Sequence, residues 1–181
     1  EETGEAFCRI RLPSLIDEEQ AQEKDAKVQE AVKRPVSIRG KKILLVEDNE
    51  LNMEIAEFLL RKEGAQVIRA WNGKEALECF EASAPGDISV ILMDLVMPVM
   101  DGFGVLKRMK ERRMIEEIPV IVISAEVSIP TIRQTYEMGV VDYISRPFDA
   151  QIVYNRVFNT IKLYAKQRRL MKILTDQARE K

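Results

Sequence analysis

From Lys41 onward, short apolar runs of strand length alternate with amphipathic stretches, and this alternation constrains the fold more than any other feature. Such alternation is typical of βα units built around a parallel sheet. Five units are present, so the sequence predicts an α/β fold with five parallel strands. The third and fourth runs are apolar enough to be buried on both faces, which predicts a central position for them. The predicted strands are Ile43–Val46, Gln66–Ala70, Ile88–Met93, Pro119–Ile123 and Val141–Ile144.

Helical spacing of apolar residues fills the segments between the predicted strands. Gly64 and Gly139 follow two of these segments, at points where a helix needs a C-terminal cap. Residues 17–34, in contrast, are dominated by charge and lack apolar periodicity, which indicates a linker. The predicted helices are Leu51–Glu63, Lys74–Ala82, Phe103–Arg112, Ile129–Met138 and a long one from Ala150.

The last predicted helix continues beyond the point where a domain of this kind would end. Its apolar residues alternate spacings of three and four, as in a short heptad seam. A free apolar stripe needs burial, so we expect residues 164–181 to pair with a second copy in a homodimer. The chain then divides into a folded domain at 41–160 and a helical extension at 161–181. The seam consists of Val157, Thr160, Tyr164, Gln167, Met171, Leu174 and Ala178.

The residue types that are missing narrow the chemistry. Histidine is absent, which removes a histidine nucleophile, general base and metal ligand. Cys8 and Cys79 are too few and too far apart for a disulfide framework or a metal knuckle, so a reducing cytoplasm is the expected location. The chain has neither a long apolar run nor a signal-peptide pattern, so we expect no association with a membrane. Any chemistry must use carboxylates, hydroxyls and cations.

Carboxylates follow two of the predicted strands. Glu47 and Asp48 come directly after the first strand, and Asp94 comes directly after the third. In an open parallel sheet of order 2-1-3-4-5, ligands bind where the strand order reverses, outside the carboxyl ends of strands one and three. Three carboxylates there repel one another by about 4 kcal/mol per pair at about 4 Å, with an effective dielectric constant near 20. They therefore need a cation, and a donor set made only of oxygen favours magnesium.

A plainer interpretation of these residues exists. Glu47 and Asp48 can form an acidic turn in which Asp48 or Asn49 caps the helix that follows. The presence of Asp94 at the matching strand end favours the metal-binding crevice over this turn. We assign Asp101-Gly102 a structural role, because this pair is more often a turn than a ligand.

A hydroxyl and a cation accompany the predicted crevice. The fourth predicted strand ends in Ser124-Ala125, and Arg146 follows the fifth. Both strand ends open onto the edge of the sheet that carries the carboxylates. A carboxylate can act as a phosphoryl nucleophile through an acyl phosphate, while a metal and a cation neutralise charge on the transferring oxygens. Asp94 is the natural nucleophile, because it stands alone on its strand and leaves Glu47 and Asp48 to hold the metal.

Four stretches of the chain together resemble the receiver domains of bacterial response regulators and hybrid histidine kinases. They are Lys42–Asp48 (KILLVED), Met93–Gly102 (MDLVMPVMDG), Ser124-Ala125 and Asp142–Phe148 (DYISRPF). The resemblance covers residues 41 to about 160. It implies a flavodoxin-like, doubly wound sheet of order 2-1-3-4-5 and membership of a two-component phosphorelay.

The resemblance also implies roles for the residues of the crevice. By this resemblance Asp94 is the phosphoacceptor and a ligand of Mg²⁺. Asp48 is a direct ligand of the metal, Glu47 is an indirect one, and Val96 supplies a backbone carbonyl. The phosphoryl donor implied is a histidine kinase or a phosphotransfer protein.

The resemblance gives Ser124 and Arg146 catalytic roles beside Asp94, and gives Ser124 and Tyr143 roles in switching. Ser124 corresponds to the switch hydroxyl, and Tyr143 to the switch aromatic that rotates inward. Arg146 departs from the family pattern, which usually has lysine before the proline. Arginine keeps the charge but replaces a compact ammonium with a planar fork. The resemblance also predicts a cis bond between Arg146 and Pro147.

Two functions remain in competition. The leading hypothesis is a phosphorylatable switch with no enzymatic activity beyond its own phosphorylation and dephosphorylation. The rival is a pseudo-receiver that serves as a dimerisation or docking module, with Arg146 closing the pocket through a bidentate pair to Asp94. A phosphatase of the phospho-aspartate type would need an acid or base two residues after the nucleophile, where this chain has Val96.

The two ends of the chain suggest different parent architectures. Thr3–Pro13 resembles the final strand of a histidine kinase ATPase domain, which makes residues 1–16 a remnant of such a domain and residues 17–40 a linker. The stretch from Asp142 into the long helix instead resembles receivers that precede an output domain. The basic tail around Arg168-Arg169 is interpreted as a solvated helix face, so we expect no nucleic-acid partner.

Overall fold

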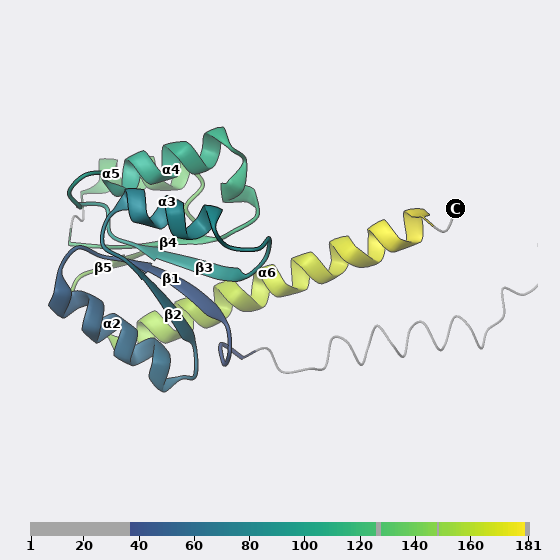
Figure 1. Cartoon of the computed structure of the whole chain (residues 1–181), viewed down its shortest axis with the longest axis horizontal. Helices are drawn as coiled ribbons and strands as arrows, with labels where there is room; N and C mark the ends of the chain where they lie inside the picture. The colour runs from purple at the N-terminus through teal and green to yellow at the C-terminus, as the bar shows by residue number, and fades with distance from the viewer. Residues whose placement is uncertain (1–36, 126–127, 148, 180–181) are drawn as a thin grey trace, which may run out of the picture. The chain divides into compact units, whose positions relative to one another are not determined.

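The computed structural model describes residues 37–125, 128–147 and 149–179, and in them a five-stranded parallel sheet forms the centre of the fold. The strand order is β2-β1-β3-β4-β5, which confirms the predicted topology (Figure 1). The expectations for residues 1–16, for most of the linker and for Cys8 fall outside the described residues. The strands are β1 (Lys42–Val46), β2 (Gln66–Ala70), β3 (Ile88–Met93), β4 (Val120–Ser124) and β5 (Asp142–Ser145).

Helices cover both faces of the sheet, as a doubly wound fold requires. Figure 1 shows α2 and α6 on one face and α3, α4 and α5 on the other. Each face has its own apolar core, and almost every residue of β3 and β4 is buried between the two, because strands covered on both sides have no solvent face. The helices are α2 (Glu50–Lys62), α3 (Gly73–Glu81), α4 (Gly102–Glu111), α5 (Ile129–Glu137) and α6 (Ala150–Arg179), with a short 3₁₀ helix η1 (Met114–Glu116) after α4.

Polar caps and glycines set the helix boundaries. The side chain of Asn49 accepts a hydrogen bond from the Asn52 amide and begins α2. Asp101 begins α4 in the same way, by accepting from the Gly104 amide at 2.7 Å, which agrees with the structural role assigned to it. Gly64 and Gly139, with φ of +86° and +100°, follow α2 and α5 in the left-handed region that favours glycine.

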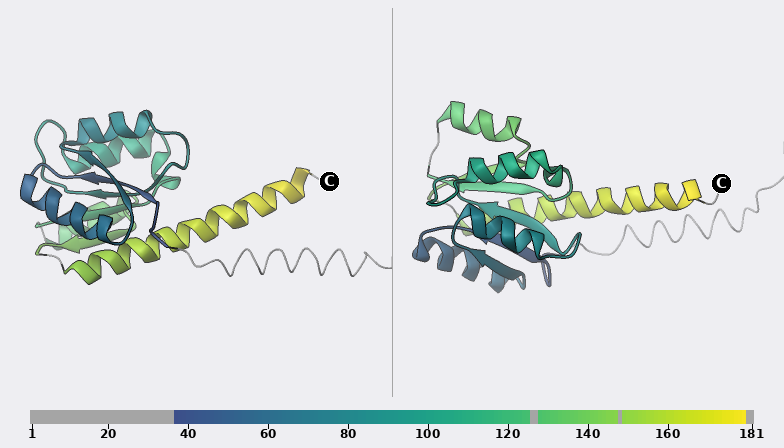
Figure 2. Two further views of the ribbon diagram at one scale, coloured as in Figure 1. Left: turned by 60° about the horizontal axis from the view of Figure 1, so that its bottom comes forward. Right: turned by 45° about the horizontal axis from the view of Figure 1, so that its top comes forward.

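Helix α6 buries side chains against the domain only along its first half, although Arg168 farther along donates to the Glu117 carbonyl at 3.2 Å. Val153, Val157 and Ile161 are buried against α2 and the sheet, at a spacing of four residues. Beyond them, four large apolar side chains of the helix are exposed, and Figure 2 shows α6 running well past the edge of the sheet. The exposed residues of this part are Leu163, Leu170, Met171 and Leu174. In the described part of the chain, no helix combines the length and hydropathy needed to cross a bilayer.

Candidate metal and phosphoacceptor site

The strand register brings three carboxylates to one edge of the sheet. Val46 at the end of β1 pairs with Met93 at the end of β3, and the Asp94 amide donates to the Val46 carbonyl at 2.9 Å. The residues that follow these strands therefore leave the sheet side by side. Oxygen atoms from Glu47, Asp48 and Asp94 all lie within 4.8 Å of one another. The carboxylates thus converge where the sheet topology predicts.

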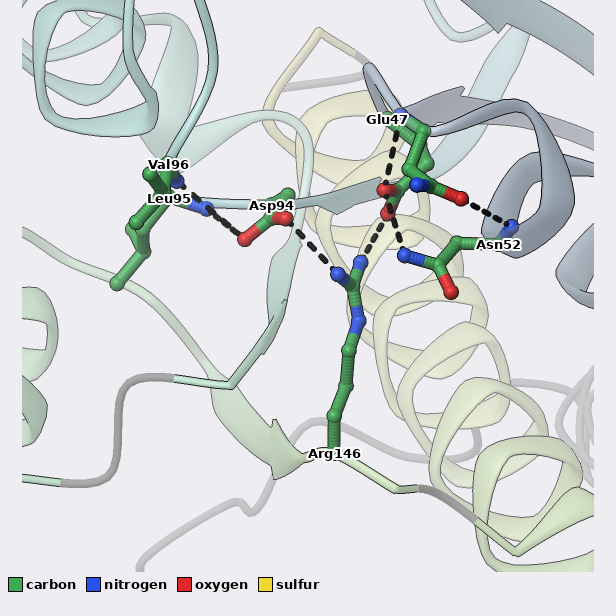
Figure 3. A network of polar contacts seen from close by, with 7 residues as sticks. Glu47, Asn52, Asp94, Leu95, Val96 and Arg146 are labelled. Carbon is green, nitrogen blue, oxygen red and sulfur yellow. Dashed lines mark hydrogen bonds and ion pairs between the residues drawn. The ribbon is translucent and has the colours of Figure 1, made fainter.

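Asp94 is held by its own backbone and by one cation (Figure 3). Its carboxylate is buried, and Oδ1 accepts hydrogen bonds from the amides of Leu95 at 2.6 Å and Val96 at 3.3 Å. Oδ2 forms an ion pair with Nη1 of Arg146 at 3.0 Å. These contacts fix the orientation of the carboxylate before any ligand binds.

Glu47 is held in a similar way by the start of α2. Its Oε1 accepts from the Asn52 side chain at 3.1 Å and from the Asn49 amide at 3.3 Å, while Oε2 pairs with Nη2 of Arg146. Burial raises the pKa of Glu47, and the neighbouring charge of Asp94 adds to this rise. Hydrogen bonding by Asn52 and the charge of Arg146 act in the opposite direction without cancelling the rise.

Arg146 spans the two buried carboxylates. Its Nη1 contacts Asp94 and its Nη2 contacts Glu47, so the guanidinium fork is divided between two partners (Figure 3). The expectation of a bidentate pair to Asp94 alone is therefore wrong. The reason is spatial, because Glu47 lies close enough to Asp94 for a planar fork to reach an oxygen of each. Only 15% of the side chain is exposed.

Asp48 differs from its two neighbours because it is exposed. Its carboxylate accepts no hydrogen bond from any residue that the structure describes, and Asn49 rather than Asp48 caps α2. The pocket therefore combines one solvated carboxylate with two oriented ones. A donor set made only of oxygen atoms fits a hard divalent cation such as Mg²⁺.

Residues 43–158 match the family model of the response regulator receiver domain. The chain belongs to this family. It is 35% identical over 124 residues to the polar-differentiation response regulator DivK of Brucella anthropi, an alignment that covers 68% of this chain and 95% of DivK. It is also 30% identical over 138 residues to histidine kinase 3 of Arabidopsis thaliana, covering 65% of this chain but only 13% of that kinase.

Solved structures agree with this family relationship. A chain in the CheX-CheY-BeF3-Mg+2 complex from Borrelia burgdorferi superposes on the receiver with a TM-score of 0.62 at 26% identity, and covers 67% of this chain and 89% of its own. The relatives come from plants as well as bacteria, so family membership does not by itself assign a bacterial source.

The two residues expected to act in switching are both buried in the receiver. Ser124 ends β4 with 1% of its surface exposed, and its carbonyl accepts the Arg146 amide at 3.0 Å. Tyr143 on β5 is 8% exposed and lies in the core on the α3–α5 face, so its ring is turned inward. The Arg146–Pro147 bond is cis, as the resemblance predicts.

Asn52 is a pocket residue that the sequence argument missed. It lies in the first turn of α2, where its side-chain amide donates to Glu47 and its backbone amide donates to Asn49. The sequence did contain a sign of this role. Asn52 comes three residues after the helix cap Asn49, and a side chain at that position faces back toward the end of the preceding strand. Asn52 also lines a cavity of about 430 Å³ with Ile55, Ala125, Arg146 and Pro147.

Proposed function

We propose that this receiver is the phosphoacceptor switch of a two-component phosphorelay, with Asp94 phosphorylated in a magnesium-dependent reaction. The observation that carries the proposal is the convergence of Glu47, Asp48 and Asp94 within 4.8 Å, beside the cation of Arg146. Clustered carboxylates and a fixed positive charge are what transfer of a phosphoryl group to a carboxylate requires.

In this reaction a carboxylate oxygen of Asp94 attacks the phosphorus of a phosphohistidine. A P–O bond forms as the P–N bond breaks, and the bonding electron pair leaves with the imidazole nitrogen of the donor. The amides of Leu95 and Val96 hold the Asp94 carboxylate in place throughout, which lowers the entropic cost of the attack. Water later attacks the aspartyl phosphate and regenerates the carboxylate and free phosphate.

The residues proposed to hold Mg²⁺ are the carboxylates of Asp48 and Asp94 and the backbone carbonyl of Val96, with Glu47 acting indirectly. The cation would neutralise charge on the transferring oxygens. The exposure of Asp48 supports this assignment, because a solvated carboxylate can bind a cation that keeps several of its waters. The similar chain from Borrelia burgdorferi belongs to a CheX-CheY-BeF3-Mg+2 complex, which supports a magnesium site in this receiver.

Ser124 and Tyr143 are proposed to transmit the phosphorylated state to the surface. Ser124 is adjacent to Arg146 through a backbone hydrogen bond at the pocket edge of the sheet, so its hydroxyl is suited to follow a new phosphoryl group. Tyr143 lies on β5, the strand that leads to Arg146, and its side chain points into the core. The Tyr143 ring already lies in the core in this structure, so the proposed switch is between this inward arrangement and an outward one, with movement of Ser124 toward the pocket favouring the inward ring.

We further propose a receiver domain at 41–160 and an extension at 161–181 that pairs with a second copy. The family match ends at residue 158, and the buried contacts of α6 end at Ile161. The phosphoryl donor would be a histidine kinase or a phosphotransfer protein in the cytoplasm. Residues 1–16 as a kinase remnant and 17–40 as a linker complete this scheme.

A second function is favoured by one specific observation. Arg146 already satisfies one oxygen each of Glu47 and Asp94, which would suit a pseudo-receiver that docks or dimerises without phosphorylation. The two functions differ in a single measurable property, namely whether Asp94 accepts a phosphoryl group.

The deciding experiment treats the receiver with acetyl phosphate and Mg²⁺ and separates the products by Phos-tag electrophoresis. We expect a retarded band for the parent and for Asp87→Asn, and none for Asp94→Asn. Asp87 is a matched control, because it lies just before β3 and Asp94 lies just after it. An inert parent would support the pseudo-receiver, and a retarded band in Asp94→Asn would overturn the assignment of Asp94.

A further inference from the structure

The contacts of Arg146 leave few oxygen atoms of the two buried carboxylates, Glu47 and Asp94, uncommitted. An ionised carboxylate offers about four acceptor positions on its two oxygens. Oδ1 of Asp94 has both of its positions filled by the Leu95 and Val96 amides. Oε1 of Glu47 likewise accepts from both Asn49 and Asn52. The other oxygen of each carboxylate is the one that the guanidinium contacts.

A divalent cation held directly by Asp48 and Asp94, and through water by Glu47, would have to approach those same two oxygens. Oδ2 of Asp94 and Oε2 of Glu47 each bond to one nitrogen of the Arg146 fork. A cation could enter beside the guanidinium only by placing like charges on one oxygen, in a pocket where both carboxylates are buried and poorly screened. Occupation by the guanidinium and occupation by a divalent cation therefore oppose one another.

We infer that Arg146 gates the metal site: its guanidinium and a divalent cation compete for the negative charge of Glu47 and Asp94. The pocket then alternates between a closed state, bridged by arginine, and a loaded state in which arginine has withdrawn. This inference rests on the proposed magnesium site. Beyond that site, the inference says that Arg146, a residue of the same chain, controls whether the metal can bind.

The surroundings of Arg146 allow the guanidinium to withdraw. Its Nε is buried but donates no hydrogen bond to any described residue, so the two Nη contacts are what hold the head group in the pocket. The cavity of about 430 Å³ that Arg146 helps to line opens beside Asn52, Ile55 and Ala125. The released fork can therefore swing into this space while keeping its backbone position.

The planar fork explains why arginine closes the site. Two nitrogens on a rigid plane can each take an oxygen from a different carboxylate, which a single ammonium on a shorter stem does less well. Lysine at position 146 would keep the charge and its pair with Asp94 but release Oε2 of Glu47. The variant Arg146→Lys therefore removes the bridge without removing the charge, and separates competition from simple electrostatic repulsion.

The test measures magnesium affinity in the parent, in Arg146→Lys and in Arg156→Lys. Binding is followed by the fluorescence of Trp71, the single tryptophan of the chain. Trp71 is close to the pocket in the chain, because the carbonyl of the preceding residue, Ala70, accepts a hydrogen bond from the Glu47 amide. Arg156 is the matched control, because it is an arginine on the surface of α6 paired with Asp142. We expect Arg146→Lys to bind magnesium about tenfold more tightly, which corresponds to about 1.4 kcal/mol, and Arg156→Lys to bind like the parent.

Equal magnesium affinity in the parent and in Arg146→Lys would overturn the gate. If the parent were still phosphorylated by acetyl phosphate, the proposed function would stand without it. Absence of magnesium binding in all three proteins would overturn the gate and the metal assignment together.

A second readout uses the parent chain alone, so that it does not depend on the folding of a variant. In an NMR titration with Mg²⁺, the side-chain Nε and Nη resonances of Arg146 should shift together with the backbone amide of Asp48. A titrating Asp48 amide beside unmoved Arg146 resonances would also overturn the gate.

Discussion

Glu57 on α2 is a buried carboxylate outside the acidic pocket, and two arginines hold it. Its side chain is only 8% exposed, and it accepts from Nε of Arg61 and from Nε of Arg69, each at 2.6 Å. Burial by itself would raise the pKa of Glu57, but the hydrogen bonds and charges of Arg69 and Arg61 outweigh burial, so this pKa is lowered. A lowered carboxyl pKa stabilises the fold above the unfolded value of 4.5 and stops doing so as the pH falls through the folded value.

We therefore predict that Glu57→Gln lowers the free energy of unfolding by about 1 kcal/mol at neutral pH, because both arginines are partly exposed and remain solvated. The difference between parent and variant should shrink as the pH falls below 4.5. Urea denaturation at several pH values measures this. A difference that stayed constant on acidification would show that the charge of Glu57 does not stabilise the fold.

The residue scale also shows where sequence reasoning reaches its limit. The positions of Glu47, Asp48 and Asp94 followed from strand ends and sheet order, because backbone topology alone brings such residues together. The division of the Arg146 fork did not follow, since it depends on the distance between two side chains that no sequence spacing encodes. The contact of Asn52 with Glu47 depends on a rotamer in the same way.

At the scale of elements, the boundaries of helices and strands agreed with the sequence to within one or two residues. Caps such as Asn49 and Gly64 mark the ends of α2 chemically, so the boundary can be predicted from local sequence. The short 3₁₀ helix η1 was not predicted. It spans only three residues, and so short an element lacks the periodicity on which a prediction depends.

Helix α4 begins against the backbone of the phosphoacceptor. A Cβ at Gly102 would lie 2.7 Å from the Asp94 carbonyl oxygen and 2.9 Å from the Leu95 Cα. We predict that Gly102→Ala lowers the free energy of unfolding by about 1–3 kcal/mol and slows phosphorylation, because backbone atoms must move.

Gly104→Ala is the control for this prediction. A Cβ at Gly104 would meet the Met100 side chain at 3.0 Å, which can rearrange. The comparison uses thermal denaturation and the rate of phosphorylation by acetyl phosphate. Equal effects of the two substitutions would remove any special role for the close approach of α4 to Asp94.

The exposed half of α6 leads to a prediction about assembly. Leu163, Leu170, Met171 and Leu174 are each about 60% exposed on the part of the helix that leaves the domain. We predict that the receiver is a dimer in light scattering and that Met171→Glu with Leu174→Glu makes it a monomer, because charges in a helix seam oppose pairing.

The control for the dimer is Lys172→Glu, which changes an exposed charge on the same turn without touching Met171 or Leu174. It should leave the mass of the dimer unchanged. A parent that remained a monomer at high concentration would refute the pairing.

At the scale of the whole molecule, sheet order and strand register together create the function proposed for this receiver. Order 2-1-3-4-5 places the ends of β1 and β3 side by side, and β5 then delivers Arg146 to the same edge. The alternation of strands and helices predicted a parallel sheet with right-handed crossovers, while the strand order followed from the resemblance to receiver domains. The architecture of the parent protein was not predictable, because receivers occur in very different proteins. The matched region makes up 13% of histidine kinase 3 but 95% of DivK.

The central claim is that Asp94 accepts a phosphoryl group with the help of Mg²⁺, and its most direct test locates the modification chemically. The receiver is treated with acetyl phosphate with and without Mg²⁺, reduced with borohydride to convert an aspartyl phosphate to homoserine, and mapped by peptide mass spectrometry. The account predicts homoserine at position 94 alone, and only with Mg²⁺ present. Homoserine at another position, equal conversion without Mg²⁺, or no conversion at all would contradict it.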